Sequence, residues 1–190
     1  MLSGSRFVLV RRALHPVETE RLRLLPWDDS YADQFVALCT DPVAMSFISR
    51  GNPLPRAVVD EILARTQQMW REHGFGPWAA LERATERWIG RIGLNLLADW
   101  PGKDKWEVGY ELVPPAWGKG YATEGARRAI RFAWEETPLE RVISVTVPDH
   151  LASRRVMEKA GMTLQGEVDW RGTTVVWYAL DRSPAQAQVR

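Results

Sequence analysis

A glycine-rich loop stands between an alternating strand and an amphipathic helix, and its residue types suit the binding of phosphate. Gly118 and Gly120 flank Lys119, and a helix is expected to begin near Ala122, so the amides from Gly120 to Thr123 lack partners within the helix. Glycines let a ligand's oxygen atoms approach the backbone, and the helix dipole favours negative charge there. The apolar face that predicts this helix is formed by Ala122, Ala126, Ala129, Ile130 and Ala133.

The spacing of this loop excludes two common nucleotide-binding motifs. A Walker loop needs Ser or Thr directly after its Lys to hold magnesium, whereas Lys119 is followed by Gly120. A dinucleotide fingerprint needs a third glycine where Thr123 stands. The loop therefore belongs to neither class.

The strand before the loop carries two acidic side chains on one face. Glu107 and Glu111 are separated by Gly109, and the pair of prolines at 114–115 ends the strand by removing two backbone donors. The opposite face carries Val108, Tyr110 and Leu112. Either carboxylate could accept a proton, directly or through water. The competing interpretation is that each one faces solvent or pairs with an arginine.

A second strand and helix follow. Residues 141–147 alternate as a buried strand, and Pro148-Asp149 turns the chain into a helix from about His150 to Ala160. Gly161 is expected to end this helix in the left-handed conformation.

The loop resembles the pyrophosphate loop of the GNAT superfamily of acyl-CoA-dependent N-acyltransferases. That family's pattern is Gln or Arg, two residues, Gly, one residue, and then Gly or Ala. Gly120 and Ala122 match this pattern, and Trp117 replaces the Gln or Arg. Trp-Gly at this point is similar to the branch that contains the ribosomal-protein alanine and serine N-acetyltransferases.

The second strand and helix support the same resemblance independently. In the family this unit carries Asn, two residues, Ser or Ala, and ends in Gly-Phe. Ser153 and Gly161 match, whereas His150 stands where the family has Asn and Met162 where it has Phe. Met157 occupies the position at which many members place a catalytic Tyr. The resemblance runs from about Glu20 to Asp181.

The resemblance implies that acetyl-CoA is the co-substrate and that backbone groups hold much of it. Its pantetheine arm is expected along the end of the strand, where Leu112 and Val113 would offer peptide groups. Pro114 cannot donate, so the donor that polarises the thioester carbonyl is expected from Val113 or earlier. The other residues implied in binding are Trp117, Gly118, Lys119, Gly120, Tyr121, Ala122, Thr123, His150 and Ser153.

The proton transfers are assigned to side chains. Glu107 is the slightly preferred base for the amine, Glu111 is the alternative, and His150 is a minor alternative because its intrinsic pKa is nearer neutrality. His150 could equally be a partly exposed cap residue. Ser153 resembles the family serine beside the CoA sulfur and would assist the leaving thiolate; the competing interpretation is an ordinary first-turn serine.

The predicted order of elements is that of the GNAT fold: a mixed α/β chain with a twisted, mostly antiparallel central sheet, splayed between its fourth and fifth strands and flanked by helices. The GNAT domain is expected over residues 19–182. Residues 1–18 are interpreted as an extension, either disordered or packed as an added strand, and residues 183–190 as a flexible tail. Strands are expected at 21–25, 77–82, 87–97, from 105, 141–147, 163–170 and 173–181, and the first helices at 28–39 and 55–73.

Composition limits the remaining classes. The chain has 190 residues and a formal net charge of +1, so neither an extended nucleic-acid surface nor more than one domain is expected. No apolar run is long enough to span a membrane. One cysteine, Cys39, fits a reducing cytoplasm and lies far from the motifs, and no metal-ligand spacing appears. The resemblance leaves a homodimer open.

The expected function is therefore cytoplasmic, acetyl-CoA-dependent N-acetylation by direct transfer, without an acyl-enzyme. A protein N-terminal α-amine is the first-choice acceptor by resemblance to the ribosomal-protein branch. A small-molecule amine, such as an antibiotic, a polyamine or an amino acid, is the second choice. The rival from a different class is a non-catalytic acyl-CoA-binding regulatory module.

Overall fold

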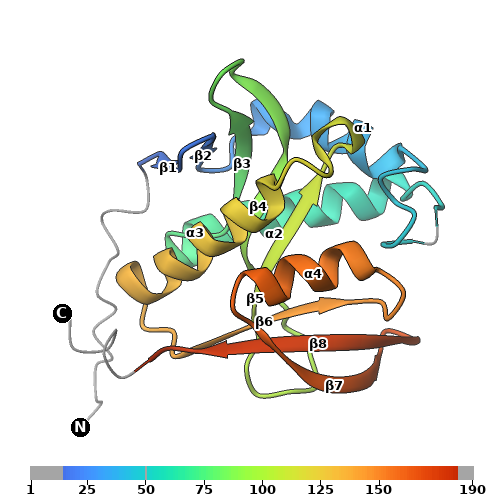
Figure 1. Cartoon of the computed structure of the whole chain (residues 1–190). Coiled ribbons are helices and arrows are strands. Elements are labelled where there is room, and N and C mark those ends of the chain that lie inside the picture. The colour runs from blue at the N-terminus through green and yellow to red at the C-terminus, as the bar shows by residue number, and fades with distance from the viewer. Residues whose placement is uncertain (1–14, 50, 184–190) are drawn as a thin grey trace, which may run out of the picture.

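One eight-stranded sheet organises the chain in a computed structural model, which describes residues 15–49 and 51–183 (Figure 1). The strand order is β1-β2-β3-β4-β5-β6-β8-β7. The strands are β1 (Val17–Glu18), β2 (Leu22–Leu25), β3 (Pro77–Glu82), β4 (Arg87–Leu96), β5 (Trp106–Leu112), β6 (Arg141–Thr146), β7 (Thr163–Trp170) and β8 (Thr173–Asp181). The helices are α1 (Ala32–Thr40), α2 (Arg56–His73), α3 (Tyr121–Glu136) and α4 (Leu151–Lys159), with short 3-10 turns at Asp29–Tyr31 and Pro114–Ala116.

The sheet splays between β5 and β6. This neighbouring pair is parallel and is joined at one registered position, Glu107 opposite Ile143, whereas the other neighbouring strands pair antiparallel. The two strands therefore diverge beyond that position, toward the end of β5. This confirms the predicted fold class, including the splay between the fourth and fifth predicted strands, which become β5 and β6 because β1 is an addition.

Helices cover both faces of the sheet. On one face, Val108 and Leu112 of β5 join a buried cluster with apolar residues of α3 and Met157 of α4. On the other face, apolar residues of α1 and α2 pack on Ala79 and Leu81 of β3. Side chains alternate along a strand, so Glu107, Gly109 and Glu111 project from β5 toward the α1/α2 face.

The observed elements lie within a few residues of those expected from periodicity. Gly74 and Gly161 both adopt a positive φ, 73° and 92°, just beyond α2 and α4. Arg171 and Gly172, which join β7 to β8, have φ values of 52° and 72°, as a two-residue hairpin turn requires.

The ends of the chain were assigned to an extension and a tail. Val17–Glu18 pairs with β2 as a short added strand, one of the two alternatives expected for residues 1–18. Residues 1–14 and 184–190 lie outside the described part of the chain. Within that part, no helix is both long enough and apolar enough to cross a membrane.

Candidate active site

A cavity of about 830 Å³ opens where the sheet splays, and both faces contribute to its wall. The loop before α3, the end of β6 and α4 line the side expected to receive the co-substrate. The segment between α1 and α2, part of α2 and the β7–β8 hairpin line the other side. Glu107, Gly109 and Glu111 of β5 lie on the wall between these elements.

The glycine loop has the backbone that a phosphate cradle requires. Gly118 and Gly120 adopt φ values of 72° and 84°, a region that residues with a Cβ atom rarely occupy. Gly120 is the N-cap of α3, which begins at Tyr121, one residue before the expected start, and no side chain caps this helix. The first amides of α3 therefore face the cavity without a side-chain cap, at the positive end of the helix.

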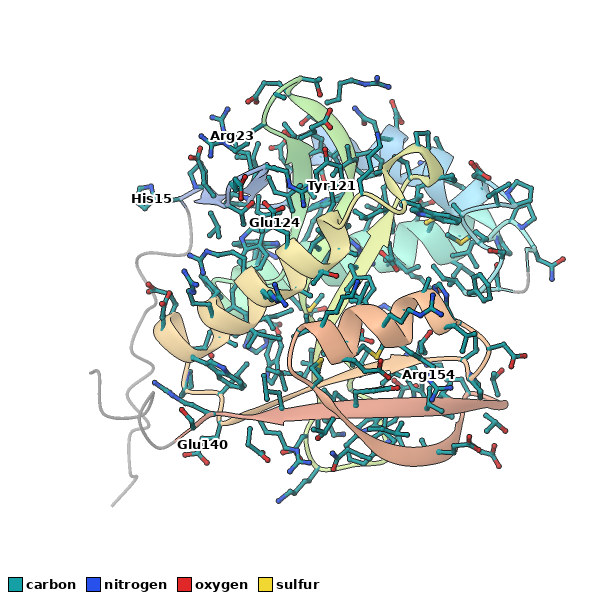
Figure 2. All side chains as sticks on the ribbon, viewed as in Figure 1. His15, Arg23, Tyr121, Glu124, Glu140 and Arg154 are labelled. Atoms are coloured by element: carbon teal, nitrogen blue, oxygen red, sulfur yellow. The ribbon has the colours of Figure 1, made fainter. Side chains whose placement is uncertain are left out.

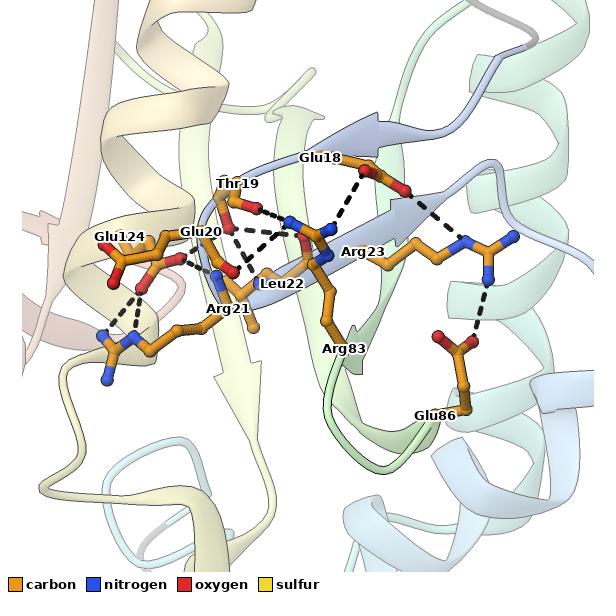
Figure 3. Close-up of polar contacts among 9 residues, drawn as sticks. All are labelled: Glu18, Thr19, Glu20, Arg21, Leu22, Arg23, Arg83, Glu86 and Glu124. Atoms are coloured by element: carbon orange, nitrogen blue, oxygen red, sulfur yellow. Dashed lines mark hydrogen bonds and ion pairs between the residues drawn. The ribbon is translucent and has the colours of Figure 1, made fainter.

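A polar network ties Glu124, in the first turn of α3, to the residues at the start of β2 (Figure 3), and one further bond of this network reaches the loop. The Arg21 guanidinium contacts the Glu124 carboxylate through Nε and Nη2, both at 2.7 Å, and its Nη1 donates to the Lys119 carbonyl at 2.8 Å. Thr19 Oγ1 and the Arg21 backbone amide donate to the other Glu124 oxygen at 2.5 and 2.8 Å. The first turn of α3 and the loop are thus held by one cluster. A Cβ atom on Gly120 would lie 3.3 Å from Arg21 Nη2.

Several loop side chains turn to other partners. Tyr121 donates its hydroxyl to the Glu82 carboxylate of β3, and the Arg21 guanidinium lies 4.8 Å from the centre of its ring. Figure 2 shows Tyr121 and Glu124 together at the start of α3, on the side of β2. Trp117 is exposed, but its Nε1 donates to the Leu112 carbonyl at 2.7 Å. These positions therefore offer mainly backbone to a ligand.

The end of β5 departs from the expectation in one respect. The Val113 amide donates to the Ile89 carbonyl at 3.0 Å, so it belongs to the pairing with β4 and is not directed into the splay. Amides of an antiparallel strand alternate in direction, so the Leu112 amide points to the opposite side, toward β6. Leu112 therefore replaces Val113 as the candidate donor to a thioester carbonyl. The sequence pattern indicated both Leu112 and Val113, but it could not predict the register between β4 and β5, which decides the direction of each amide.

Glu107 has a strongly altered proton affinity. Burial raises its pKa to about 7, and the neighbouring Glu111 charge adds to this effect. The Val145 amide, Asn95 and Arg91 act in the opposite direction. Asn95, which lies opposite Glu107 across the β4–β5 pair, places its Nδ2 3.4 Å from a Glu107 oxygen. Such a carboxyl exchanges its proton near neutral pH, as a general base must.

Glu111 is held differently, although it lies on the same face. Arg91, a buried residue of β4, contacts one Glu111 oxygen through Nε and Nη2 at 2.8 and 2.6 Å. The same guanidinium donates to Thr66 of α2 at 2.9 Å and stacks on Phe35 of α1. A carboxylate held in this way is the counter-ion of a buried guanidinium, so the arginine-paired interpretation fits Glu111.

Ser153 lies on the α3/α4 side of the cavity, buried on α4. Its Oγ lies 2.8 Å from the Tyr110 hydroxyl, which also donates to the Ser153 carbonyl at 3.0 Å. Burial raises the pKa of Tyr110 well above its usual range, so the phenol keeps its proton. Tyr110 was seen in the sequence only as an apolar strand residue. The observation that could have identified Tyr110 as a site residue is its hydroxyl group, which lies on the strand face opposite the two glutamates.

His150 stacks on Phe47, with ring centroids 4.0 Å apart and planes 4° apart. It occupies the N-cap position of α4 but makes no capping bond with its side chain. Its Nδ1 is buried without a hydrogen-bond partner, and burial lowers its pKa. The pair lines the cavity and joins the α1–α2 segment to α4 across the splay.

The candidate residues thus divide between the two faces of β5. Ser153, Tyr110, the glycine loop and the start of α3 lie together on the α3/α4 side, and Glu107 and Glu111 lie on the other. In α4, Arg154 turns away from the cavity and reaches Tyr178 of β8 at 3.1 Å (Figure 2). Among the described residues, no group of His, Cys, Asp and Glu is arranged to hold a metal ion.

Residues 21–163 match the acetyltransferase (GNAT) domain family, and the chain belongs to this family. It is 31% identical over 163 residues to the FsC-acetyl coenzyme A-N(2)-transacetylase of Aspergillus fumigatus, a match that covers 80% of this chain and 66% of that protein. The fold is shared with the ribosomal-protein-S5-alanine acetyltransferase of Vibrio fischeri (TM-score 0.69, 14% identity, 90% and 98% of the two chains). It is also shared with the spermidine N-acetyltransferase of Vibrio cholerae (TM-score 0.67, 15% identity, 86% and 96%). The protein is an acetyl-CoA N-acetyltransferase of the GNAT type.

Proposed function

We propose that this protein transfers acetyl directly from acetyl-CoA to an α-amine, with the N-terminal amine of a polypeptide as the first-choice acceptor. The observation that carries the proposal is Glu107, a carboxyl with a pKa of about 7 on the cavity wall beside the splay. An α-amine has a pKa near 8 and a lysine side chain one near 10.4. A base with a pKa near 7 is well matched to an α-amine and poorly matched to a lysine side chain.

The donor is held by backbone. The amides at the start of α3 would receive the pyrophosphate, and the Leu112 amide would donate to the thioester carbonyl and stabilise the negative charge that develops on its oxygen. His150 and Ser153 line the same side of the cavity. Trp117 supports the end of β5 through its bond to the Leu112 carbonyl.

The transfer requires one bond to form and one to break. The neutral amine attacks the thioester carbon, the new C–N bond forms, and Glu107 takes the proton that the nitrogen must lose, directly or through water. The C–S bond then breaks, and the thiolate leaves with its electron pair. Ser153 would donate a hydrogen bond to that sulfur. The Tyr110 hydroxyl, which has a single proton, would then donate it to Ser153 Oγ in place of the Ser153 carbonyl.

Direct transfer is supported by the state of the single cysteine. Cys39 is buried on α1, and burial raises its pKa to about 12. A thiol that is not ionised near neutral pH is a poor nucleophile, so an acyl-enzyme on Cys39 is disfavoured.

A small-molecule amine is the second candidate acceptor. It is favoured by the 31% identity to the Aspergillus transacetylase, a higher identity than to the ribosomal-protein acetyltransferase. Both candidates are amines, and both require Glu107 in the same role.

Thiol release from acetyl-CoA tests the proposal, with a panel of peptides of varied first residue and of small amines. We expect faster release with peptides that have a free Ser or Ala first residue than with blocked peptides bearing an internal lysine. If no acceptor raises thiol release above solvent hydrolysis, the non-catalytic acyl-CoA-binding module is favoured instead.

The same assay separates the candidate bases. Glu107→Gln should remove most activity at low pH, with partial recovery at high pH, where the amine loses its proton unaided. If His150→Ala instead removes the fall in activity on the acidic side of the pH profile and Glu107→Gln does not, the base is His150.

A further inference from the structure

The acceptor side of the cavity has an unusual balance of charge. Among the described residues that line the cavity, Glu107 and Glu111 are its two carboxylates. Glu111 is neutralised by the buried Arg91 at 2.6 Å. One carboxylate, Glu107, is therefore left to attract a cationic amine. A polycation, which carries several ammonium groups, needs more than one such partner.

The cations on this side are already engaged. Arg171, at the tip of the β7–β8 hairpin, makes two bonds of 2.7 Å to Asp99 and stacks on Trp170. Arg65 of α2 donates to the Glu61 carbonyl at 3.4 Å and lies 4.0 Å from its carboxylate. Both arginines are thus balanced by carboxylates, Asp99 and Glu61, which do not line the cavity. They leave no unpaired carboxylate on this side for a second ammonium group.

Most of the rest of this wall is apolar, with Thr66, Asn95 and Thr173 as its polar members. The apolar part is formed by Met45, Phe47, Ile48, Ile62, Met69 and Trp170. Phe47 and Ile48 remain 40% and 53% exposed, which is unusual for such large apolar side chains and leaves area for a ligand to cover. These residues come from the α1–α2 segment, α2 and the hairpin, so they surround the side of β5 that carries Glu107.

We propose that the acceptor presents one cationic amine on a body that is apolar next to that amine, and that polyamines and other polycations are poor substrates. This inference rests on the proposed function and narrows it. Glu107 receives the amine, and the apolar wall covers the adjoining side chain. A second ammonium group would lie against apolar residues and arginines, without a carboxylate partner and with its hydration lost.

Matched acceptors test the inference directly. We suggest tripeptide amides that differ only in their first residue, Leu, Ala, Glu or Lys, together with spermidine, assayed by thiol release at pH 7.5. Burial of the added methylene groups should give the Leu peptide a kcat/KM about tenfold above that of the Ala peptide. The Lys peptide should fall about tenfold below the Leu peptide. Equal or faster turnover of the Lys peptide, the Glu peptide or spermidine would overturn the inference.

A pair of protein variants tests whether the effect of an added carboxylate depends on its position in the apolar wall. Ile48→Glu adds a carboxylate to the cavity wall at an exposed position, and Val43→Glu adds the same charge nearby, at a residue 56% exposed that does not line the cavity. Ile48→Glu should shift the Leu-to-Lys preference about tenfold toward Lys, while Val43→Glu should leave it unchanged. An unchanged preference in Ile48→Glu, or an equal shift in both variants, would contradict the assignment of this wall.

Failure of the inference differs from failure of the proposed function. If polycations are turned over faster than the apolar monoamines, the acceptor class is wrong and the acetyltransferase role of Glu107 remains. If Glu107→Gln keeps full activity on every acceptor, the proposed chemistry is wrong, and the charge argument that depends on Glu107 falls with it.

Discussion

The two faces of β5 differ in what they offer a substrate. On the α3/α4 face, the proposed co-substrate site consists of glycine backbone, helix amides and two hydroxyl groups. On the α1/α2 face, the proposed acceptor site consists of side chains: one carboxyl with a pKa near 7, one ion-paired carboxylate and an apolar wall. A site made of backbone groups depends on the shape of the loop and little on its side chains, whereas a site made of side chains changes its substrate when those residues are substituted. The fold therefore determines which donor is bound, and substitutions on the α1/α2 face can change which acceptor is bound.

The largest expected effect is on the backbone site. Gly120→Asp would force a side chain and a negative charge into a position with a φ of 84°, where the pyrophosphate is expected. Calorimetry should show acetyl-CoA affinity lowered at least about 100-fold. Gly161→Asp is the control, because Gly161 has a φ of 92° and lies at the end of α4, outside the loop. Unchanged affinity in Gly120→Asp would remove the main support for the loop assignment.

Removing the charge of either glutamate of β5 should change the stability of the protein, and the two changes should have opposite signs. The pKa of Glu107 is raised from 4.5 to about 7, so the folded protein binds the extra proton and loses stability as pH rises through this window. Glu107→Gln should therefore be more stable than the wild type at pH 8, by up to about 3 kcal/mol at 1.36 kcal/mol per pKa unit, and similar to it below pH 4.5.

Glu111→Gln should instead destabilise the fold at pH 8, because it leaves the buried Arg91 without its anion. Chemical denaturation of both variants at the two pH values measures the contrast. A stability change of the same sign in both variants would contradict this difference between an ion-paired Glu111 and a Glu107 whose charge is unfavourable in the fold.

The network of Arg21 should influence donor binding at a distance. Arg21→Ala removes the guanidinium bonds to Glu124 and to the Lys119 carbonyl, and we expect KM for acetyl-CoA to rise about tenfold, with a smaller change in kcat. Arg21→Lys should restore part of the loss. Arg23→Ala is the matched control, since Arg23 lies two residues along the strand and pairs with Glu86, away from the loop. Equal effects of both alanine variants would indicate general destabilisation.

A further expected effect concerns the leaving thiolate. Ser153→Ala should lower kcat by about 10 to 100-fold, and Tyr110→Phe by a smaller factor, about 3 to 10-fold, because a thiolate leaves without much assistance. If Tyr110 acts by positioning Ser153, the double variant should lose no more than Ser153→Ala alone. Additive losses would give Tyr110 a separate role.

Local patterns predicted the elements of the site better than the contacts between them. The glycine loop, the start of α3 and the position of Ser153 follow from residues close together in the sequence. The Arg91–Glu111 ion pair and the partner of the Val113 amide depend on the register between strands, and the hydroxyl pair of Tyr110 and Ser153 depends on how α4 packs on β5. Periodicity assigns a residue to a face of its own strand, but it does not say what packs against that face.

Glu107 illustrates the same limit. Its position on the strand makes it only slightly preferred over Glu111. The two residues are distinguished by their partners, a weak contact with Asn95 for Glu107 and the buried Arg91 for Glu111. The pKa near 7 arises chiefly from burial, which only the folded chain produces.

The central claim is that the two faces act separately, with Glu107 serving the acceptor alone. The most direct measurement pairs acetyl-CoA binding by calorimetry with the pH profile of kcat/KM for the best α-amine acceptor, in the wild type and in Glu107→Gln. The account predicts equal acetyl-CoA affinity in both proteins, an acidic limb with a pKa near 7 in the wild type, and a loss of about 100-fold or more at pH 6.5 in the variant. Full activity of Glu107→Gln at pH 6.5, or a matching loss of acetyl-CoA affinity, would contradict it.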